Sequence, residues 1–145
     1  MSTESSNSKR VLIADDDAVI RQIVTRLVEK EGYKPVICND GREAYQTLQA
    51  DADFRGAIFD MMMPYLEGLD IIRFMRTERR LMRIPVMLIT SEKDLKLMAN
   101  SFLSGATLFL PKPFTPENFQ LTLRLLLSNN TNRPTPPKHS LTRPI

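Results

Sequence analysis

Cysteine, histidine, tryptophan and long apolar runs are scarce or missing in this sequence. Among its 145 residues there are one cysteine, one histidine and no tryptophan. The single cysteine, Cys38, excludes an internal disulfide framework and fits the reducing cytoplasm. No apolar run approaches the ~18 residues of a membrane-spanning helix, and residues 1–8 are polar, unlike a secretory signal. We therefore expect a cytoplasmic protein without membrane contact.

A surplus of charge of one sign is also missing from most of the chain. All 17 acidic residues and all but three of the 20 basic residues lie within residues 1–127. The net charge of +3 therefore comes from Arg133, Lys138 and Arg143. Because a neutral body does not attract nucleic acid, we expect no direct nucleic-acid binding. We interpret the basic stretch at residues 73–83 as a solvated helix face.

Short apolar segments alternate along the chain with segments of helical periodicity. We expect strands at residues 10–14, 35–38, 56–60, from 84 onward and at 107–110. We expect helices between the cap Asp17 and Gly32 and over residues 42–50, 69–80, 93–104 and 116–127. Apolar runs of this kind between helices are typical of a parallel sheet that is buried on both faces. The pattern predicts an α/β protein of five βα units.

The two ends of the chain differ in composition from the part between them. Residues 1–8 are polar and are expected to be disordered. Residues 129–145 contain three prolines within positions 134–137 and few apolar side chains. Prolines cannot continue a helix, and a segment of this composition cannot bury a core. We therefore predict one folded domain over residues 9–128, followed by a flexible, proline-rich basic tail.

Residues able to act on a phosphoryl group stand at the ends of four predicted strands. Asp15–Asp17 follow the first strand, Asp60 ends the third, Thr90 ends the fourth and Lys112 follows the fifth. In an open parallel sheet these ends lie at one edge, where ligands bind. Clustered carboxylates repel one another unless a cation is present, and Mg²⁺ prefers oxygen ligands. The sequence thus predicts a site for magnesium and phosphate chemistry.

Four stretches of the chain together resemble the receiver domain of two-component response regulators. They are Val11–Asp16, Asp60–Pro64 with Gly68, Pro85–Ser91 and Lys112–Phe114. They follow the order and spacing of that family over about residues 9–127. The resemblance implies a doubly wound, flavodoxin-like (βα)₅ sandwich with a five-stranded parallel sheet in the order 2-1-3-4-5.

The resemblance also assigns roles to the acidic residues. It implies that Asp60 is the phospho-acceptor and that Asp16 is the principal Mg²⁺ ligand. Asp60 would supply a further oxygen to the metal, Asp15 would hold a metal-bound water, and the backbone carbonyl of Met62 would complete the protein ligands. Asp17 matches no family role, and we interpret it as a helix cap.

Three further residues take roles by resemblance. Thr90 and Lys112 would bind phosphoryl oxygens, and the peptide bond between Lys112 and Pro113 is expected to be cis. Thr90 and Phe109 would form the switch that responds to phosphorylation. The phosphoryl donor would be a sensor histidine kinase or a histidine phosphotransfer protein.

Met62 departs from the commonest pattern, because many members carry a polar residue two positions after the phospho-acceptor. Such a residue can contact the water that hydrolyses the aspartyl phosphate. A thioether is a poor substitute, so Met62 predicts a long-lived phosphorylated state. Glu92, two residues after Thr90, is the one nearby group that could still guide this water.

Two of the predicted helices carry more apolar residues than one buried stripe needs. The helix at 93–104 is rich in Leu, Met and Phe, and the helix at 116–127 has Leu121 and Leu125 outside its inward stripe of Phe119, Leu123, Leu126 and Leu127. Surplus apolar surface on a small domain is typical of an interface. We expect homodimerisation or a protein target at the face formed by the predicted helix 93–104, the strand 107–110 and the helix 116–127.

Two other readings use the same residues. The opening Asp15–Val19 also fits phosphotransferases of the haloacid dehalogenase type, but these need an acidic motif after the lysine, and only Glu117 follows Lys112. A receiver-like scaffold that works without phosphorylation is the other alternative. Degenerate members of that kind usually lose an acid or the lysine, and this chain keeps them all.

Overall fold

The computed structural model describes residues 8–91 and 105–132. Within these residues five strands form one parallel sheet in the order β2-β1-β3-β4-β5. The strands are β1 (Arg10–Ala14), β2 (Lys34–Cys38), β3 (Gly56–Asp60), β4 (Val86–Ser91) and β5 (Leu108–Lys112). The order confirms the prediction of a doubly wound sheet.

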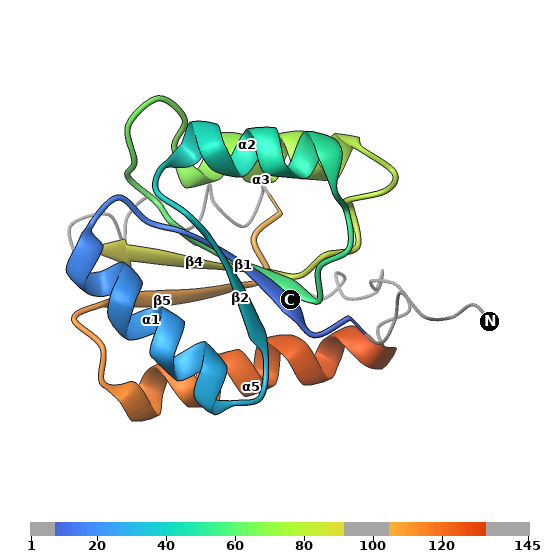
Figure 1. Ribbon diagram of the computed structural model, residues 1–145. Coiled ribbons are helices and arrows are strands. Elements are labelled where there is room, and N and C mark those ends of the chain that lie inside the picture. The colour runs from blue at the N-terminus through green and yellow to red at the C-terminus, as the bar shows by residue number, and fades with distance from the viewer. Residues whose placement is uncertain (1–7, 92–104, 133–145) are drawn as a thin grey trace, which may run out of the picture.

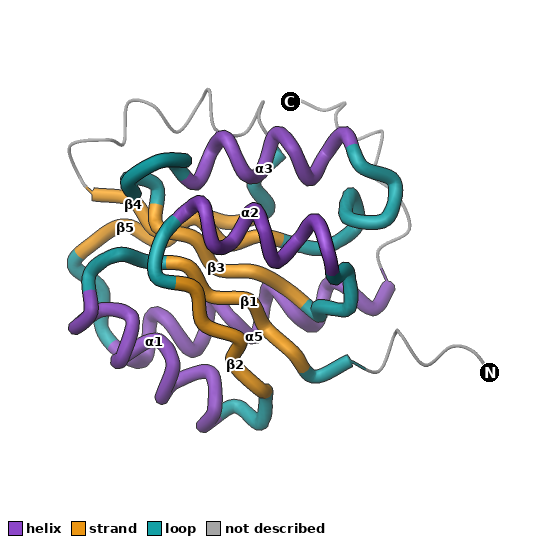
Figure 2. The backbone as a smooth tube through the Cα atoms, turned by 45° about the horizontal axis from the view of Figure 1, so that its top comes forward, coloured by secondary structure: helices purple, strands orange, loops and turns teal. Residues whose placement is uncertain are grey.

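Helices cover both faces of this sheet. The described helices are α1 (Ala18–Lys30), α2 (Gly41–Ala50), α3 (Gly68–Thr77) and α5 (Pro116–Asn132). α1 and α5 lie on one face, and α2 and α3 lie on the other (Figures 1 and 2). The helix predicted at residues 93–104 lies outside the described residues. None of the described helices combines the length and the apolar character needed to cross a bilayer.

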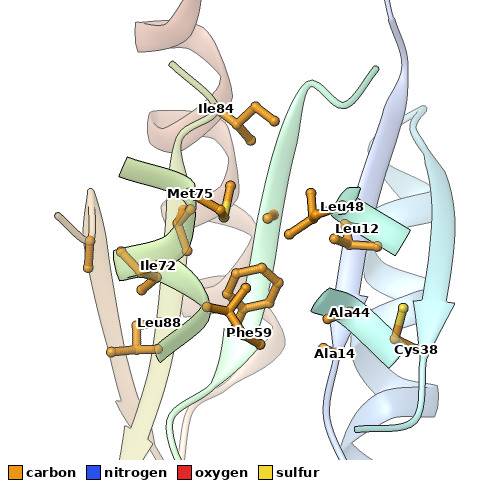
Figure 3. Close-up of a cluster of buried hydrophobic side chains, with 14 of the residues drawn as sticks. Leu12, Ala14, Cys38, Ala44, Leu48, Phe59, Ile72, Met75, Ile84 and Leu88 are labelled. Atoms are coloured by element: carbon orange, nitrogen blue, oxygen red, sulfur yellow. The ribbon is translucent and has the colours of Figure 1, made fainter. Parts of the chain in front are cut away.

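The core is divided by the sheet into two apolar clusters, because successive strand residues point to opposite faces. Leu12 and Phe59 pack in the cluster beneath α2 and α3. Their neighbours Ile13 and Ile58 pack in the cluster beneath α1 and α5. Cys38 is buried in the first cluster, where it packs as a small apolar side chain. Figure 3 shows this cluster, with side chains of α2 and α3 directed at those of β1 and β3.

Several element boundaries differ from the sequence-based expectation, and β4 begins at Val86 rather than at residue 84. α3 ends at Thr77, although helical periodicity predicted residues up to 80. A turn follows, in which Leu81 donates its N–H to the Glu78 carbonyl (2.9 Å) and is fully buried. Burying Leu81 therefore takes precedence over extending the helix. β5 includes Lys112, whereas the prediction ended this strand at Leu110.

The described structure extends into both segments that were predicted to be flexible. α5 continues past Leu127 to Asn132, so residues 129–132 belong to a helix rather than to the tail. Extending an existing helix costs less free energy than starting one, so the polar residues 129–132 can continue α5. At the other end, Ser8 Oγ donates to the Asp53 carbonyl (3.2 Å). Residues 1–7 and 133–145 lie outside the described residues.

The interpretation of the basic stretch at residues 73–83 as a solvated face is wrong for Arg76. Its Nε donates to the Gly105 carbonyl, and its Nη1 donates to the Met82 and Ile84 carbonyls, each at 3.0 Å. Burial lowers the pKa of this guanidinium. Arg76 therefore ties the end of α3 to the segments that lead into β4 and β5.

Candidate functional site at the carboxyl ends of the strands

The register of the sheet brings the predicted site residues together. Ala14 pairs with Phe59, so Asp15 and Asp60 follow in adjacent positions on β1 and β3. Asp60 pairs with Ile89, the residue before Thr90. Further along, Ser91 pairs with Lys112 on β5. Four neighbouring strands thus deliver their functional residues to one edge of the sheet, as the sequence predicted.

Three carboxylates form a compact acidic cluster at this edge. One oxygen each of Asp15, Asp16 and Asp60 can be chosen so that all three lie within 4.8 Å of one another. Asp15 and Asp60 are buried, with 2% and 5% of their surface exposed, whereas Asp16 is exposed. The cluster is therefore open to solvent on the side of Asp16.

Burial disturbs the titration of both buried acids. Burial raises the pKa of Asp15 to about 7, and the Asp60 carboxylate adds to this rise while the backbone N–H of Asp17 opposes it. Burial also raises the pKa of Asp60, against the opposing effects of Lys112 and the Met62 N–H. Both shifts show that negative charge at this cluster is incompletely compensated by the protein.

The oxygens of the cluster suit a hard divalent cation. Asp15 Oδ1 accepts the N–H of Asp17 (2.9 Å), but Asp15 Oδ2 is buried and finds no hydrogen-bond partner among the described residues. A buried carboxylate oxygen without a donor is costly. A cation beside Asp15, Asp16 and Asp60 would remove this cost, and an all-oxygen set of this kind fits Mg²⁺.

The loop from β1 to α1 holds the acidic cluster in place. Asp17 caps α1 by accepting the N–H groups of Val19 (2.9 Å) and Ile20 (3.3 Å), as predicted. Arg21 Nη1 donates to the Asp15 carbonyl (2.8 Å). This contact from the first turn of α1 was not predicted, since no local pattern identifies it.

The loop from β3 to α3 approaches the site closely. The N–H of Gly68 donates to the Met61 carbonyl (3.1 Å). A Cβ atom at Gly68 would lie 2.6 Å from the carbonyl oxygen of Asp60, so only glycine fits there. Tyr65 has a φ of 71°, and its ring lies 4.0 Å from the Arg42 guanidinium carbon. Glycine at position 68 thus lets α3 begin directly beside Asp60.

The two predicted phosphoryl-binding residues, Thr90 and Lys112, contact different partners. Lys112 Nζ is 3.5 Å from Asp60 Oδ1, and the peptide bond between Lys112 and Pro113 is cis, as expected. Thr90 is 1% exposed. Its hydroxyl donates to Met61 Sδ at 3.2 Å and lies 3.3 Å from the Ser91 carbonyl oxygen. The contact with Met61 was not anticipated from the sequence.

Comparison with known proteins decides the family. The sequence model of the response regulator receiver domain matches residues 11–124. The chain belongs to the response regulator receiver family. The chemotaxis protein CheY1 of Helicobacter pylori is 31% identical over 122 residues, which cover 83% of this receiver domain's chain and 98% of CheY1. The response regulator MprA of Mycolicibacterium vanbaalenii is 31% identical over 122 residues, which cover 84% of the chain and 52% of MprA.

Solved structures agree with this assignment. The chemotaxis response regulator CheY4 of Vibrio cholerae matches the receiver domain with a TM-score of 0.76 and 32% identity, over 83% of this chain and 99% of CheY4. The receiver domain of the sensor histidine kinase PA1611 from Pseudomonas aeruginosa matches with a TM-score of 0.74 over 83% of this chain and 98% of its own. That structure holds a magnesium ion in its active site cleft, but at 21% identity the likeness shows the fold alone.

The remaining predicted residues of the receiver domain lie in different surroundings. Phe109 is partly buried and packs against the cluster beneath α2 and α3. Met62 is 53% exposed, and its backbone N–H lowers the pKa of Asp60 through a hydrogen bond. Glu92 lies outside the described residues, so its predicted part in guiding water stays a prediction. Leu121 and Leu125 are 56% and 49% exposed on α5, as their spacing indicated.

A pocket at the opposite end of the receiver domain is separate from this chemistry. It has a volume of about 380 Å³ and lies where β2 and β3 begin, against the later part of α5. Its lining residues are Glu31, Tyr33, Arg55, Leu123, Arg124, Leu127 and Ser128. None of these residues is in the acidic cluster, and the shallow acidic edge rather than this pocket carries the reactive groups.

Proposed function

We propose that this receiver domain accepts a phosphoryl group on Asp60. The donor is the phosphohistidine of a sensor histidine kinase or of a histidine phosphotransfer protein. A carboxylate oxygen of Asp60 attacks phosphorus, so that a P–O bond forms while the P–N bond breaks. The imidazole nitrogen keeps the bonding electron pair and takes up a proton. The product is an aspartyl phosphate on the receiver.

The observation that carries this proposal is the position of Asp60 between Lys112 and the other two acids. Its Oδ1 lies 3.5 Å from Lys112 Nζ, and it shares the acidic cluster with Asp15 and Asp16. Because Lys112 already lies beside Asp60, its ammonium group can neutralise an oxygen of the incoming phosphoryl group. Asp15 is equally buried after β1, but among the described residues only Asp60 is a buried acid in an ion pair with a lysine.

Mg²⁺ is the proposed cofactor. Asp16 and Asp60 would bind it directly, Asp15 would hold one of its waters, and the backbone carbonyl of Met62 would add a further oxygen. When bound, the ion supplies positive charge that offsets repulsion between carboxylates and phosphoryl oxygens. The exposed side chain of Asp16 leaves the open side of the cluster accessible to the ion.

The response to phosphorylation is proposed to run through Thr90 and Phe109. Thr90 would donate its hydroxyl to a phosphoryl oxygen, and Phe109, partly buried on β5, would change its packing. The face formed by the helix predicted at residues 93–104, by β5 and by α5 would then bind a protein target or a second copy of the chain. The exposed Leu121 and Leu125 of α5 support such an interface.

Several further expectations belong to this proposal. The receiver would catalyse its own phosphorylation and dephosphorylation as a switch rather than act on a separate substrate. It would work in the cytoplasm, in keeping with its single cysteine. It would not itself bind nucleic acid, because residues 1–127 carry balanced charge.

Labelling with acetyl phosphate and Mg²⁺ tests the proposal. The parent should acquire acid-labile phosphate that hydroxylamine removes, and Asp60→Asn should acquire none. Asp53→Asn, an exposed acid at the other end of the sheet, should label like the parent. Labelling of Asp60→Asn at the parent rate would exclude Asp60. A parent that takes up no label would favour the scaffold that works without phosphorylation.

A further inference from the structure

The thioether of Met61 is the resting partner of the Thr90 hydroxyl. Met61 follows Asp60 directly, and its backbone N–H donates to the Ile89 carbonyl (2.8 Å), which fixes it beside β4. Its side chain is 2% exposed, and its Sδ lies 3.2 Å from Thr90 Oγ1. Both partners are therefore buried, and the contact is shielded from water.

The Thr90 hydroxyl is buried and has one proton, for which it needs a hydrogen-bond acceptor. The Met61 sulfur and the Ser91 carbonyl oxygen, at 3.2 Å and 3.3 Å, are its acceptors. A thioether is a weak acceptor, whereas a phosphoryl oxygen is a charged and strong one. In the resting protein the hydroxyl therefore donates a weak hydrogen bond, and replacing this bond by one to a phosphoryl oxygen costs little free energy.

We propose that Met61 is a positioning residue that sets how readily Thr90 turns to a phosphoryl group on Asp60. This inference rests on the proposed function. The sulfur holds the hydroxyl in the resting orientation, and binding of a phosphoryl group must break that contact. The strength of the acceptor at position 61 therefore opposes phosphoryl binding, and a change of acceptor changes the affinity in a definite direction.

Binding of beryllofluoride, which imitates a phosphoryl group on a carboxylate, measures this effect at fixed Mg²⁺. Met61→Leu removes the acceptor but keeps a similar volume, and it should bind beryllofluoride about two- to fivefold more tightly than the parent. Met61→Gln restores an acceptor stronger than sulfur, and its affinity should return to the parent value or fall below it. The titrations can be followed by calorimetry.

Met63→Leu is the matched control. Met63 is buried in the same cluster as Met61, at 7% exposure, but makes no hydrogen bond with Thr90. It should leave the affinity within about 1.5-fold of the parent, whereas equal gains in Met61→Leu and Met63→Leu would assign the effect to core packing. The ¹³C shift of the Thr90 methyl group in the free protein should change in Met61→Leu alone.

The outcomes separate this inference from the proposed function. If the parent binds beryllofluoride but Met61→Leu binds it no more tightly, the role of Met61 is refuted and the function stands. If the parent does not bind beryllofluoride at all, the proposed function fails and this inference fails with it.

Discussion

Asp15 and Asp17 are joined by a hydrogen bond that leaves the second oxygen of Asp15 without a donor. The Asp17 N–H donates to Asp15 Oδ1 at 2.9 Å, while Oδ2 is buried without a hydrogen-bond partner in the described part of the chain. Burial and the neighbouring Asp60 carboxylate raise the pKa of Asp15 to about 7. The site therefore stores an electrostatic cost that a proton or a cation can relieve.

Asp15→Asn should stabilise the metal-free receiver at high pH. The pKa of Asp15 is raised from 3.8 to about 7, so between these values the folded state binds more protons than the unfolded state. The free energy of unfolding of the parent must then fall as pH rises through this window. Asn keeps the acceptor for Asp17 but has no charge, so at pH 8 the variant should be more stable by about 1–3 kcal/mol.

Urea unfolding in EDTA measures this difference. The advantage of Asp15→Asn should shrink as pH is lowered from 8 toward 4, because the folded parent takes up a proton on Asp15 through its pKa of about 7 and loses the buried charge. Excess Mg²⁺ at pH 8 should narrow or reverse the difference, because it stabilises the parent more than the variant. The same advantage at pH 5 and pH 8 would contradict the assignment of the effect to the Asp15 charge.

Asp16 and Asp17 should respond differently to substitution by alanine. Asp17 caps α1 through the N–H groups of Val19 and Ile20, so Asp17→Ala should lower the free energy of unfolding by about 1 kcal/mol and spare Mg²⁺ affinity. Asp16 belongs to the acidic cluster, so Asp16→Ala should lower Mg²⁺ affinity with little loss of stability. Calorimetric titration with Mg²⁺ and urea unfolding distinguish the two. Equal loss of Mg²⁺ affinity in both variants would argue against these roles.

Arg76→Ala should destabilise the receiver by about 2–4 kcal/mol. The guanidinium donates to the carbonyls of Gly105, Met82 and Ile84, each at 3.0 Å. Its removal takes the donor from the part-buried Gly105 and Ile84 carbonyls at the entry to β4 and β5, where an unpaired polar group is costly. Urea unfolding at neutral pH provides the measurement.

Arg73→Ala is the control for this prediction. The Arg73 side chain is 60% exposed, and its one ion pair within the described residues is with Asp70, at 3.5 Å, so its loss should cost no more than about 0.5 kcal/mol. A similar loss of stability in both variants would mean that the buried contacts of Arg76 do not set its contribution.

The sheet could be predicted more closely from the sequence than the helix ends. β1 and β3 begin and end at the predicted residues, Arg10–Ala14 and Gly56–Asp60, because an apolar run buried on both faces has abrupt polar limits. α3 ends early at Thr77, since the turn that buries Leu81 depends on a core assembled from distant segments. The helical periodicity of the sequence does not show whether burying Leu81 in a turn is more favourable than extending the helix.

The site residues could be predicted, but the contacts that tune them could not. Parallel strands align their carboxyl ends at one edge of the sheet, which brings together Asp15, Asp60, Thr90 and Lys112. This rule can be applied once the strands have been predicted from the sequence. The distance from Thr90 to the Met61 sulfur depends on rotamers and on the register between two strands. This contact cannot be predicted from the spacing of residues in the sequence.

The aspartyl phosphate of this receiver should be long-lived because of Met62. Hydrolysis needs a water aligned opposite the bond that breaks, and correct placement of a nucleophile contributes strongly to its rate. Met62 is 53% exposed and follows Asp60, a member of the acidic cluster, by two positions. Its thioether is a weak acceptor, so it orients a water poorly, and its apolar bulk takes up room that the water needs.

Met62→Asn supplies an amide that can hold this water, and it should speed decay of the phosphorylated protein by about tenfold. The backbone carbonyl at this position is unchanged, so Mg²⁺ affinity should stay close to that of the parent. Met82→Asn is the control, because Met82 is also exposed, at 48%, but lies in the turn before β4, far from the carboxyl ends of the strands. The measurement is the loss of acid-labile phosphate from purified protein without kinase. Decay of Met62→Asn at the rate of the parent and of Met82→Asn would show that Met62 does not control the lifetime.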